Sequence, residues 1–307
     1  MKLIESSYEF APQAPEIEGM YKQVELGARC CYNSQHLITE DSYKTLIDSL
    51  KKRKHYSPFA HGTVYLKLDK TNSDLADRNE VFDHYLNNFW SRVVINNDTA
   101  YITSNMRVLL ENGWEEDLKF WSEPTEYHIK RITIKFNSSI GVSREINRHS
   151  VSLSVCEQST RYCNYSKDKF GNELTFVIPE WVKTRINDTA ESFDPLTWRR
   201  KDYLVNMSIF KAIDCMCAED RAINCWIESL KRTEDDYMYL LSDECCLKPE
   251  EARGVLDLDL ATEVYYTGYI NDWKHVFEMR TNPAAHPDAR AICCPLEAEF
   301  KLKGYIE

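Results

Sequence analysis

Residues 146–162 read INRHSVSLSVCEQSTRY and place two cationic side chains and a carboxylate within one short stretch. Arg148 and His149 are adjacent, and they are followed by Glu157, Ser159 and Arg161. Arginine suits phosphate because its planar guanidinium can donate two parallel, charge-assisted hydrogen bonds. A simpler interpretation is a helix, on which Glu157 and Arg161 would form a surface ion pair contributing roughly 0.2–0.5 kcal/mol. From the spacing of this stretch alone, we favour the polar helix with its ion pair over an anion site.

The overall composition is that of an ordinary globular protein with a sizeable core. Of the 307 residues, 43% are hydrophobic and 28% are charged. The formal net charge of −11 provides no basic field for nucleic acid, so an anionic ligand must be bound by local arginines. No stretch approaches the roughly 20 apolar residues that span a bilayer, and the N-terminal MKLIESSYEF lacks an apolar signal core. The length allows one large domain or two ordinary ones, and we expect neither membrane nor nucleic-acid partners.

The cysteines and glycines argue against several common kinds of site. The eleven cysteines are an odd number and include no C-x-x-C pair with zinc spacing. We expect no metal site, and reduced thiols in the cytoplasm. The chain has only nine glycines, and neither G-x-G-x-x-G nor G-x-x-x-x-G-K occurs. This argues against the Rossmann and P-loop phosphate sites.

Helical and strand patterns are mixed along the chain. Helical patterns predict helices over the segments 15–30, 42–53, 198–242 and 269–280, and mostly over 71–127. Alternating or apolar runs predict strands over 63–69, 131–136, 174–179 and 258–268. The segments SREINRH (143–149) and SVCEQSTRY (154–162) are interpreted as helical turns. The fold class is therefore α/β, in the broad sense that includes α+β.

Four segments, taken in order, resemble the flavin-dependent thymidylate synthase (ThyX) family. GARCCYNS (27–34) resembles the end of the family's first helix, and HYSPFAH (55–61) resembles its histidine turn before a strand. RHS…EQSTRY (148–162) resembles the R-H-R-x7-S signature, and ARGVL (252–256) followed by Arg280 resembles the C-terminal part. Each segment alone is weak, but four in order at consistent spacing imply the family's fold, a mixed sheet flanked by helices, as a single domain over residues 1–307.

The resemblance implies a reaction and its participants. It implies reductive methylation of dUMP to dTMP, with FAD as cofactor and with methylenetetrahydrofolate and NADPH as co-substrates. It implies no cysteine nucleophile, and a homotetramer whose sites lie between subunits. The catalytic arginine, which stabilises charge developing on the uracil ring, corresponds to Arg280. A fixed guanidinium aimed at developing negative charge lowers the reaction barrier.

The resemblance also assigns binding residues. The positions that bind dUMP correspond to Arg148, Ser159, Arg161, Arg253 and Arg280. The positions at the flavin correspond to His55, Ser57, Arg148, His149 and Glu157.

The chain departs from the family pattern mainly on the flavin side. Ser150 replaces the third arginine of the signature, and the spacer between His149 and Ser159 is one residue longer than in the family. Losing an arginine contact to a flavin phosphate would cost roughly 1.5–3 kcal/mol. The other changed positions are Glu145 for a glutamine, Ala60 for an acid, Asp257 for a proline, His275 for an asparagine, and Tyr269-Ile270-Asn271 for N-x-R.

Three functions therefore stay open. The first is an active flavin-dependent thymidylate synthase, which the retained uracil-side residues favour. The second is a relative that modifies another pyrimidine nucleotide at C5. The third is a catalytically impaired nucleotide-binding protein.

Residues 69–130 are interpreted as a helical insertion relative to compact family members. Within it, TSNMR (103–107) has the N-x-R spacing that is missing later in the chain. One hypothesis is that Asn105 and Arg107 replace the lost flavin contacts. The simpler alternative, which we favour, is a helix start with an exposed arginine.

Overall fold

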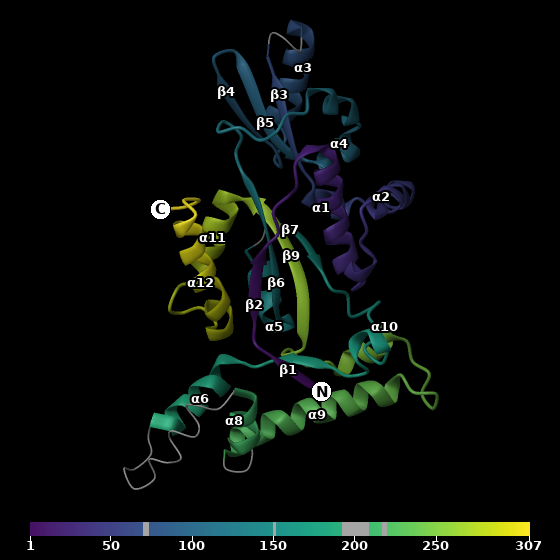
Figure 1. Ribbon diagram of the computed structural model, residues 1–307, viewed down its shortest axis with the longest axis vertical. Helices are drawn as coiled ribbons and strands as arrows, with labels where there is room; N and C mark the ends of the chain where they lie inside the picture. The colour runs from purple at the N-terminus through teal and green to yellow at the C-terminus, as the bar shows by residue number, and fades with distance from the viewer. Residues whose placement is uncertain (70–73, 150–151, 192–208, 217–219) are drawn as a thin grey trace.

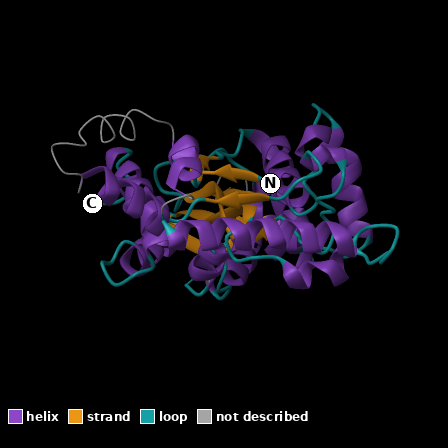
Figure 2. Cartoon of the chain, turned by 90° about the horizontal axis from the view of Figure 1, so that it is seen from below, coloured by secondary structure: helices purple, strands orange, loops and turns teal. Residues whose placement is uncertain are grey.

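The computed structural model describes residues 1–69, 74–149, 152–191, 209–216 and 220–307. The molecule is elongated, with a central sheet between an inserted sheet at one end and helices at the other (Figure 1). Seen along that long axis, the strands lie in the middle and helices surround them (Figure 2). This mixture confirms the predicted fold class.

The central sheet holds four strands in the order β2-β6-β9-β7, and all of its neighbours are antiparallel. The strands are β2 (Ser7–Phe10), β6 (Arg131–Ser139), β7 (Ser154–Glu157) and β9 (Ala261–Tyr269). Helix α1 (Glu16–Cys30) contacts β7 and β9. Helices α5 (Ile140–Asn147), α11 (Ile270–Arg280) and α12 (Pro287–Leu302) form an apolar core with the sheet.

Two strands of this sheet run directly into helices that carry predicted site residues. Strand β6 ends at Ser139, which caps α5 by accepting a hydrogen bond from the Val142 N–H at 3.2 Å. Strand β9 ends at Tyr269, whose N–H donates to the Asp272 carboxylate in the first turn of α11. Because β6 and β9 are antiparallel, α5 and α11 start at opposite ends of this strand pair, and both contribute residues to one apolar core with the sheet.

The inserted segment contains a second sheet as well as helices. Its strands β4 (Arg92–Asn96) and β5 (Thr99–Asn105) join β3 (Thr63–Leu68), which directly precedes the segment, in the order β3-β5-β4. Its helical segments are α3 (Leu75–Leu86), α4 (Met106–Asn112) and η3 (Glu115–Phe120). The prediction of a mostly helical segment was therefore wrong for β4 and β5. Asn97 and Asp98 join them with positive φ angles of 48° and 64°, the hairpin signal that the prediction overlooked.

The far end of the molecule is built from helices around a short parallel pair. Strand β1 (Lys2–Ile4) pairs with β8 (Thr175–Val177). Helices α6 (Glu180–Glu191), α8 (Ile209–Met216) and α9 (Arg221–Leu240) lie beside this pair (Figure 1). The helix predicted over 198–242 corresponds to α8 and α9, and its remaining parts, 198–208 and 217–219, lie outside the described residues.

Other predicted elements are confirmed, with one clear correction. Helices α1, α11 and α2 (Ser42–Lys52) and strands β3, β6, β8 and β9 stand where the patterns predict them. The segment SVCEQSTRY is not helical, because its first four residues form strand β7 and the rest forms turns. Alternating serine and apolar residues suit a strand, one face of which is buried. No helix of the described residues is both long enough and apolar enough to cross a membrane.

Candidate active site

Arg280 is the most firmly held of the predicted site residues. It ends α11 and is only 7% exposed. Its Nε and Nη2 atoms donate to the Glu145 carbonyl oxygen at 2.9 and 2.6 Å, and Nη2 lies 3.0 Å from the Glu145 carboxylate. Hydrogen bonds from a charged donor are strong, so the guanidinium is fixed against α5. Glu145 also balances part of its charge.

Arg148 and His149 lie next to Arg280 and Glu145, closer to the surface. The Arg148 side chain is 72% exposed and makes a loose ion pair of 3.8 Å with Glu145, three residues earlier. The His149 ring meets the His275 ring edge to face, with 5.7 Å between centroids. Burial lowers the pKa of His149, and electrostatic effects of Arg280, His275 and Arg148 lower it further, against the opposing effect of Glu145. The surroundings of His149 are therefore electropositive, which suits an anion. We call Glu145, Arg148, His149, His275 and Arg280 the α5–α11 group.

Ser159 and Arg161 belong to a second group, at the end of β7. The Ser159 N–H donates to the Cys31 carbonyl at 3.0 Å. Arg161 is exposed and its Nη2 lies 3.3 Å from a carboxylate oxygen of Glu250 in α10 (Pro249–Ala252). Arg253 follows α10 directly in the short helix η6 (Arg253–Val255) and is also exposed. We call Ser159, Arg161, Glu250 and Arg253 the β7–α10 group.

The predicted ion pair between Glu157 and Arg161 was wrong. Glu157 instead accepts a hydrogen bond from the Ser143 hydroxyl at 2.7 Å, while Arg161 pairs with Glu250. The reason is that a strand and a turn, rather than a helix, separate the two residues. Burial raises the pKa of Glu157, although hydrogen bonding from Ser143 opposes the shift. Glu157 therefore connects β7, which leads to the β7–α10 group, with α5, which leads to the α5–α11 group.

The histidine turn divides into an exposed and a buried part. His55 and Ser57 are exposed on the segment that leads into η2 (Ser57–His61). His61 is buried, and its Nδ1 lies 2.8 Å from the Thr267 hydroxyl of β9. Burial lowers the pKa of His61 to about 3, so the ring is neutral in the folded protein. His61 is therefore a structural residue, whereas His55 and Ser57 are accessible to a ligand.

The structure tests the hypothesis on TSNMR (103–107) but not the one on Ser150. Ser150, at the third position of the signature, lies outside the described residues. Asn105 caps α4 by accepting from the Val108 N–H, and exposed Arg107 pairs with Glu111 at 2.8 Å. These contacts support the simpler interpretation of TSNMR as a helix start with a surface ion pair.

Sequence patterns missed two acidic partners of the arginines. Glu145 stands three residues before Arg148, a helical spacing that could have indicated their contact. Its stronger contact with Arg280 spans 135 positions and leaves no local signal. Glu250 is 89 positions from Arg161 and is equally invisible to local patterns.

The fold is a mixed α/β fold, and its described residues include two groups in which arginine side chains are paired with Glu145 and Glu250. A family model described as thymidylate synthase complementing protein matches residues 123–303, more than half of the chain. The chain therefore belongs to this family, that of the flavin-dependent thymidylate synthases. The match begins at the end of the inserted segment and includes both groups.

Other comparisons add little beyond the family. No curated protein matches the chain. Among solved structures, the chain is similar to a UMP/dUMP methylase, PolB from Streptomyces cacaoi, bound with 5-Br dUMP. The two are 15% identical with a TM-score of 0.41, over 98% of this chain and 93% of the other.

Proposed function

We propose that this protein is a flavin-dependent thymidylate synthase that methylates dUMP at C5 to give dTMP. The observation that carries the proposal is the anchored guanidinium of Arg280, the residue that by resemblance corresponds to the arginine with which the family activates the uracil ring. Membership of the family supports the same reaction. NADPH and methylenetetrahydrofolate are the proposed co-substrates, and the free thiols of the described part fit a cytoplasmic enzyme.

Arg280 would act through electrostatics rather than covalent chemistry. Attack on the uracil ring develops negative charge, and a guanidinium that is already fixed needs no reorganisation to stabilise it. The Glu145 carboxylate weakens this effect because it lies 3.0 Å from the same guanidinium. It also offers an acceptor, which a pyrimidine N–H or amino group could satisfy.

FAD fits the exposed side of the α5–α11 group. When bound, it would supply the redox chemistry of the reaction. The guanidinium of Arg148 is largely exposed and only loosely paired, and the cations around His149 make this rim electropositive. Arg148 and His149 would therefore hold an anionic part of the cofactor, such as its diphosphate. His55, Ser57 and Glu157 are the further flavin contacts that we propose.

The β7–α10 group would bind the phosphate of dUMP. Ser159, Arg161 and Arg253 bring one hydroxyl and two exposed guanidinium groups to the surface. The pair between Arg161 and Glu250 is half-exposed on both sides, so a phosphate can displace it at little cost. In the proposed homotetramer this group completes the site of a neighbouring subunit.

Release of tritium from C5-labelled dUMP tests the reaction, and the visible spectrum tests the cofactor. We expect a yellow protein whose flavin bands bleach with NADPH, and tritium release that requires methylenetetrahydrofolate. A colourless protein that binds dUMP without releasing tritium would instead establish the impaired nucleotide-binding protein. Turnover of dCMP but not dUMP would establish the relative that acts on another pyrimidine, for which the acceptor oxygen of Glu145 is the supporting observation.

A further inference from the structure

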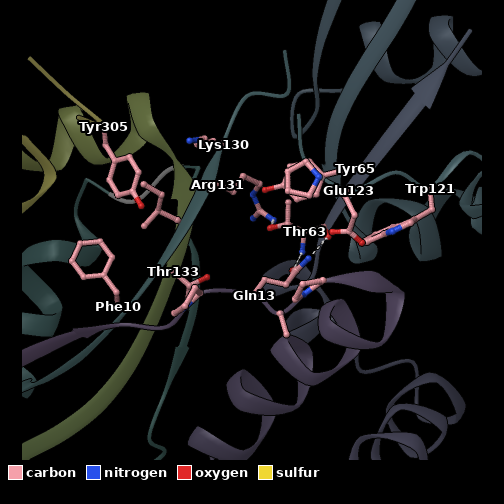
Figure 3. A pocket seen from close by; sticks show the side chains of 15 residues that line it. Phe10, Gln13, Thr63, Tyr65, Trp121, Glu123, Lys130, Arg131, Thr133 and Tyr305 are labelled. Atoms are coloured by element: carbon pink, nitrogen blue, oxygen red, sulfur yellow. Dashed lines mark hydrogen bonds between the residues drawn. The ribbon is translucent and has the colours of Figure 1, made fainter. Parts of the chain in front are cut away.

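A cavity of about 300 Å³ lies where the inserted segment meets the central sheet. None of its lining residues belongs to the two cationic groups described above. Its walls combine two cations with four aromatic rings, namely Lys130 and Arg131 with Phe10, Tyr65, Trp121 and Tyr305. In Figure 3, Arg131 lies between Phe10 and Tyr305 on one side and Tyr65 and Trp121 on the other.

The charge of Arg131 is incompletely compensated by the protein. Its Nη1 donates to the Thr63 hydroxyl at 3.2 Å, and its Nη2 lies 2.9 Å from the Ala60 carbonyl and 3.2 Å from the Ser154 hydroxyl. Within the described residues, no carboxylate lies within 4.0 Å of its guanidinium, and its shielded Nε atom has no hydrogen-bond partner. A desolvated cation is costly unless an anion pairs with it.

The surroundings reinforce the positive charge. Burial lowers the pKa of Arg131, and the nearby Arg92 contributes to the shift, although Tyr269, Tyr65 and Asp272 oppose it. Both arginines lie over the ring of Tyr269, at 4.6 Å for Arg92 and 5.6 Å for Arg131.

The other charged residues that line the cavity, Glu123 and Lys130, do not cancel the positive charge of Arg131. Glu123 also lines the cavity, but one of its carboxylate oxygens already accepts from the Glu16 N–H at 2.8 Å. Lys130 is exposed and stands near the ring of Tyr305, at 5.8 Å from its centroid. The walls therefore carry two cations against one acid that is already engaged.

We propose that this cavity is a binding site for a small organic anion with a flat, apolar body. The carboxylate or phosphate of such a ligand would face Arg131 and Lys130, and its ring would lie among the aromatic side chains. The cavity volume is at the lower end of the range for small-molecule sites, roughly 300–1,000 Å³. Trp121 and Glu123 come from the inserted segment, so the site depends on that segment.

Calorimetry or saturation-transfer NMR with three matched probes tests the charge requirement. Benzoate and phenyl phosphate carry the anion, and benzamide has the same ring without a charge. We expect one or both anions to bind at least tenfold more tightly than benzamide, and the tighter anion identifies the head group as carboxylate or phosphate. Equal binding of all three probes, or no binding of any, would overturn the proposal.

Variants place the binding in this cavity rather than at the α5–α11 group. Replacing Arg131 by Met should weaken the anion at least tenfold. Because Arg131 also hydrogen-bonds to Ala60 and Ser154, two variants that retain it make the test independent of folding. Lys130→Gln should weaken binding about threefold, and Ala14→Trp, at an exposed position of the wall, should abolish it.

The control is Arg148→Ala, which removes an exposed cation of the other group and should leave benzoate affinity unchanged. If Arg148→Ala weakens binding while Ala14→Trp does not, the anion binds at the α5–α11 group and the cavity proposal fails.

Discussion

Glu145 stands at the centre of the charge balance around Arg280, the proposed catalytic arginine. Its carboxylate lies 3.0 Å from Arg280 and 3.8 Å from Arg148, and its carbonyl accepts two further bonds from Arg280. The carbonyl contacts alone would keep the guanidinium in place. The carboxylate is therefore a means of reducing the positive charge at the site without moving Arg280.

The substitution Glu145→Gln tests this role because it removes the charge and keeps the shape. If tritium release occurs as proposed, its rate should rise about threefold to tenfold, which corresponds to about 0.7–1.4 kcal/mol of barrier. The pKa of His149 should fall further, because the carboxylate that raises it is gone. NMR titration of the His149 ring measures this shift without any turnover.

A matched control is Glu111→Gln, which removes the carboxylate that pairs with exposed Arg107 in the inserted segment. It should change neither the rate nor the His149 titration. A His149 pKa that rises in Glu145→Gln would contradict the charge balance described here.

At this scale, the sequence located the positions of Arg280, Arg148, His149, Ser159, Arg161 and Arg253 through the family resemblance. It could not reveal which acids hold them, because Glu145 and Glu250 reach their arginines across 135 and 89 positions. Such contacts arise from the packing of elements that the chain connects only at a distance. The roles of these residues in catalysis and binding stay predictions.

Among the elements, strand β7 shows which parts of the secondary structure sequence patterns could predict and which they could not. Residues 152–155, which lead into this strand, alternate serine with leucine and valine and suit a strand, but the surrounding charges suggested helical spacing. Strands β4 and β5 do not alternate, but they contain β-branched and aromatic residues and are joined by an Asn-Asp turn. Residue type and turn residues therefore indicated these strands better than periodicity did, whereas the order β2-β6-β9-β7 depends on pairings between distant segments.

Helix α1 depends on a glycine that the backbone approaches closely. A Cβ atom added at Gly19 would stand 2.0 Å from the Ala14 carbonyl oxygen, so the backbone before the helix would have to move. Gly19→Ala should therefore destabilise the protein by about 1–3 kcal/mol, although alanine ordinarily favours a helix. Urea unfolding measures the change.

Gly254→Ala is the control, because a Cβ there meets nothing within 4 Å. Its unfolding free energy should change by no more than about 0.5 kcal/mol. Equal effects of the two substitutions would rule out the steric explanation.

His61 connects η2 to the central sheet and gives this contact a pH dependence. Its pKa is about 3 in the folded protein, against 6.5 for an ordinary histidine. As the pH falls below about 6.5, the unfolded chain binds a proton that the folded chain does not, so stability is lost until about pH 3. Between pH 6 and 4, this single group should contribute up to ~1.4 kcal/mol of lost stability per pH unit.

The substitution His61→Gln should flatten this acid limb in urea unfolding at a series of pH values. Thr267→Val removes the hydrogen-bond partner but keeps the imidazole, so it should retain the slope. The decisive quantity is the slope with pH, since either variant can lower stability at neutral pH. An unchanged slope in His61→Gln would show that other groups cause the acid sensitivity.

For the whole molecule, the two cationic groups raise the question of whether one chain holds a complete site. We expect Arg161 of one subunit and Arg280 of its neighbour to act together in the proposed homotetramer. Arg161→Ala and Arg280→Ala should each abolish tritium release. Mixed tetramers refolded from equal amounts of both should regain activity in about a quarter of their sites, because a quarter combine two intact residues.

Light scattering confirms that the mixed sample is tetrameric. A mixture as inactive as its parents would show that both residues serve a site within one chain. Refolded wild-type protein provides the reference activity.

The inserted sheet shares its apolar core with the N-terminal helices. Residues of α1 and α2 pack in one cluster with β3, β5 and α4, whereas β6, β9, α5, α11 and α12 form another. Such clusters open as separate cooperative units in the native state. Backbone amides of α1 and α2 should therefore exchange hydrogen together with those of β3 and β5, and on a different timescale from β6 and β9. Mass spectrometry of exchanged peptides would then group segments that open together, even where they lie far apart in the sequence.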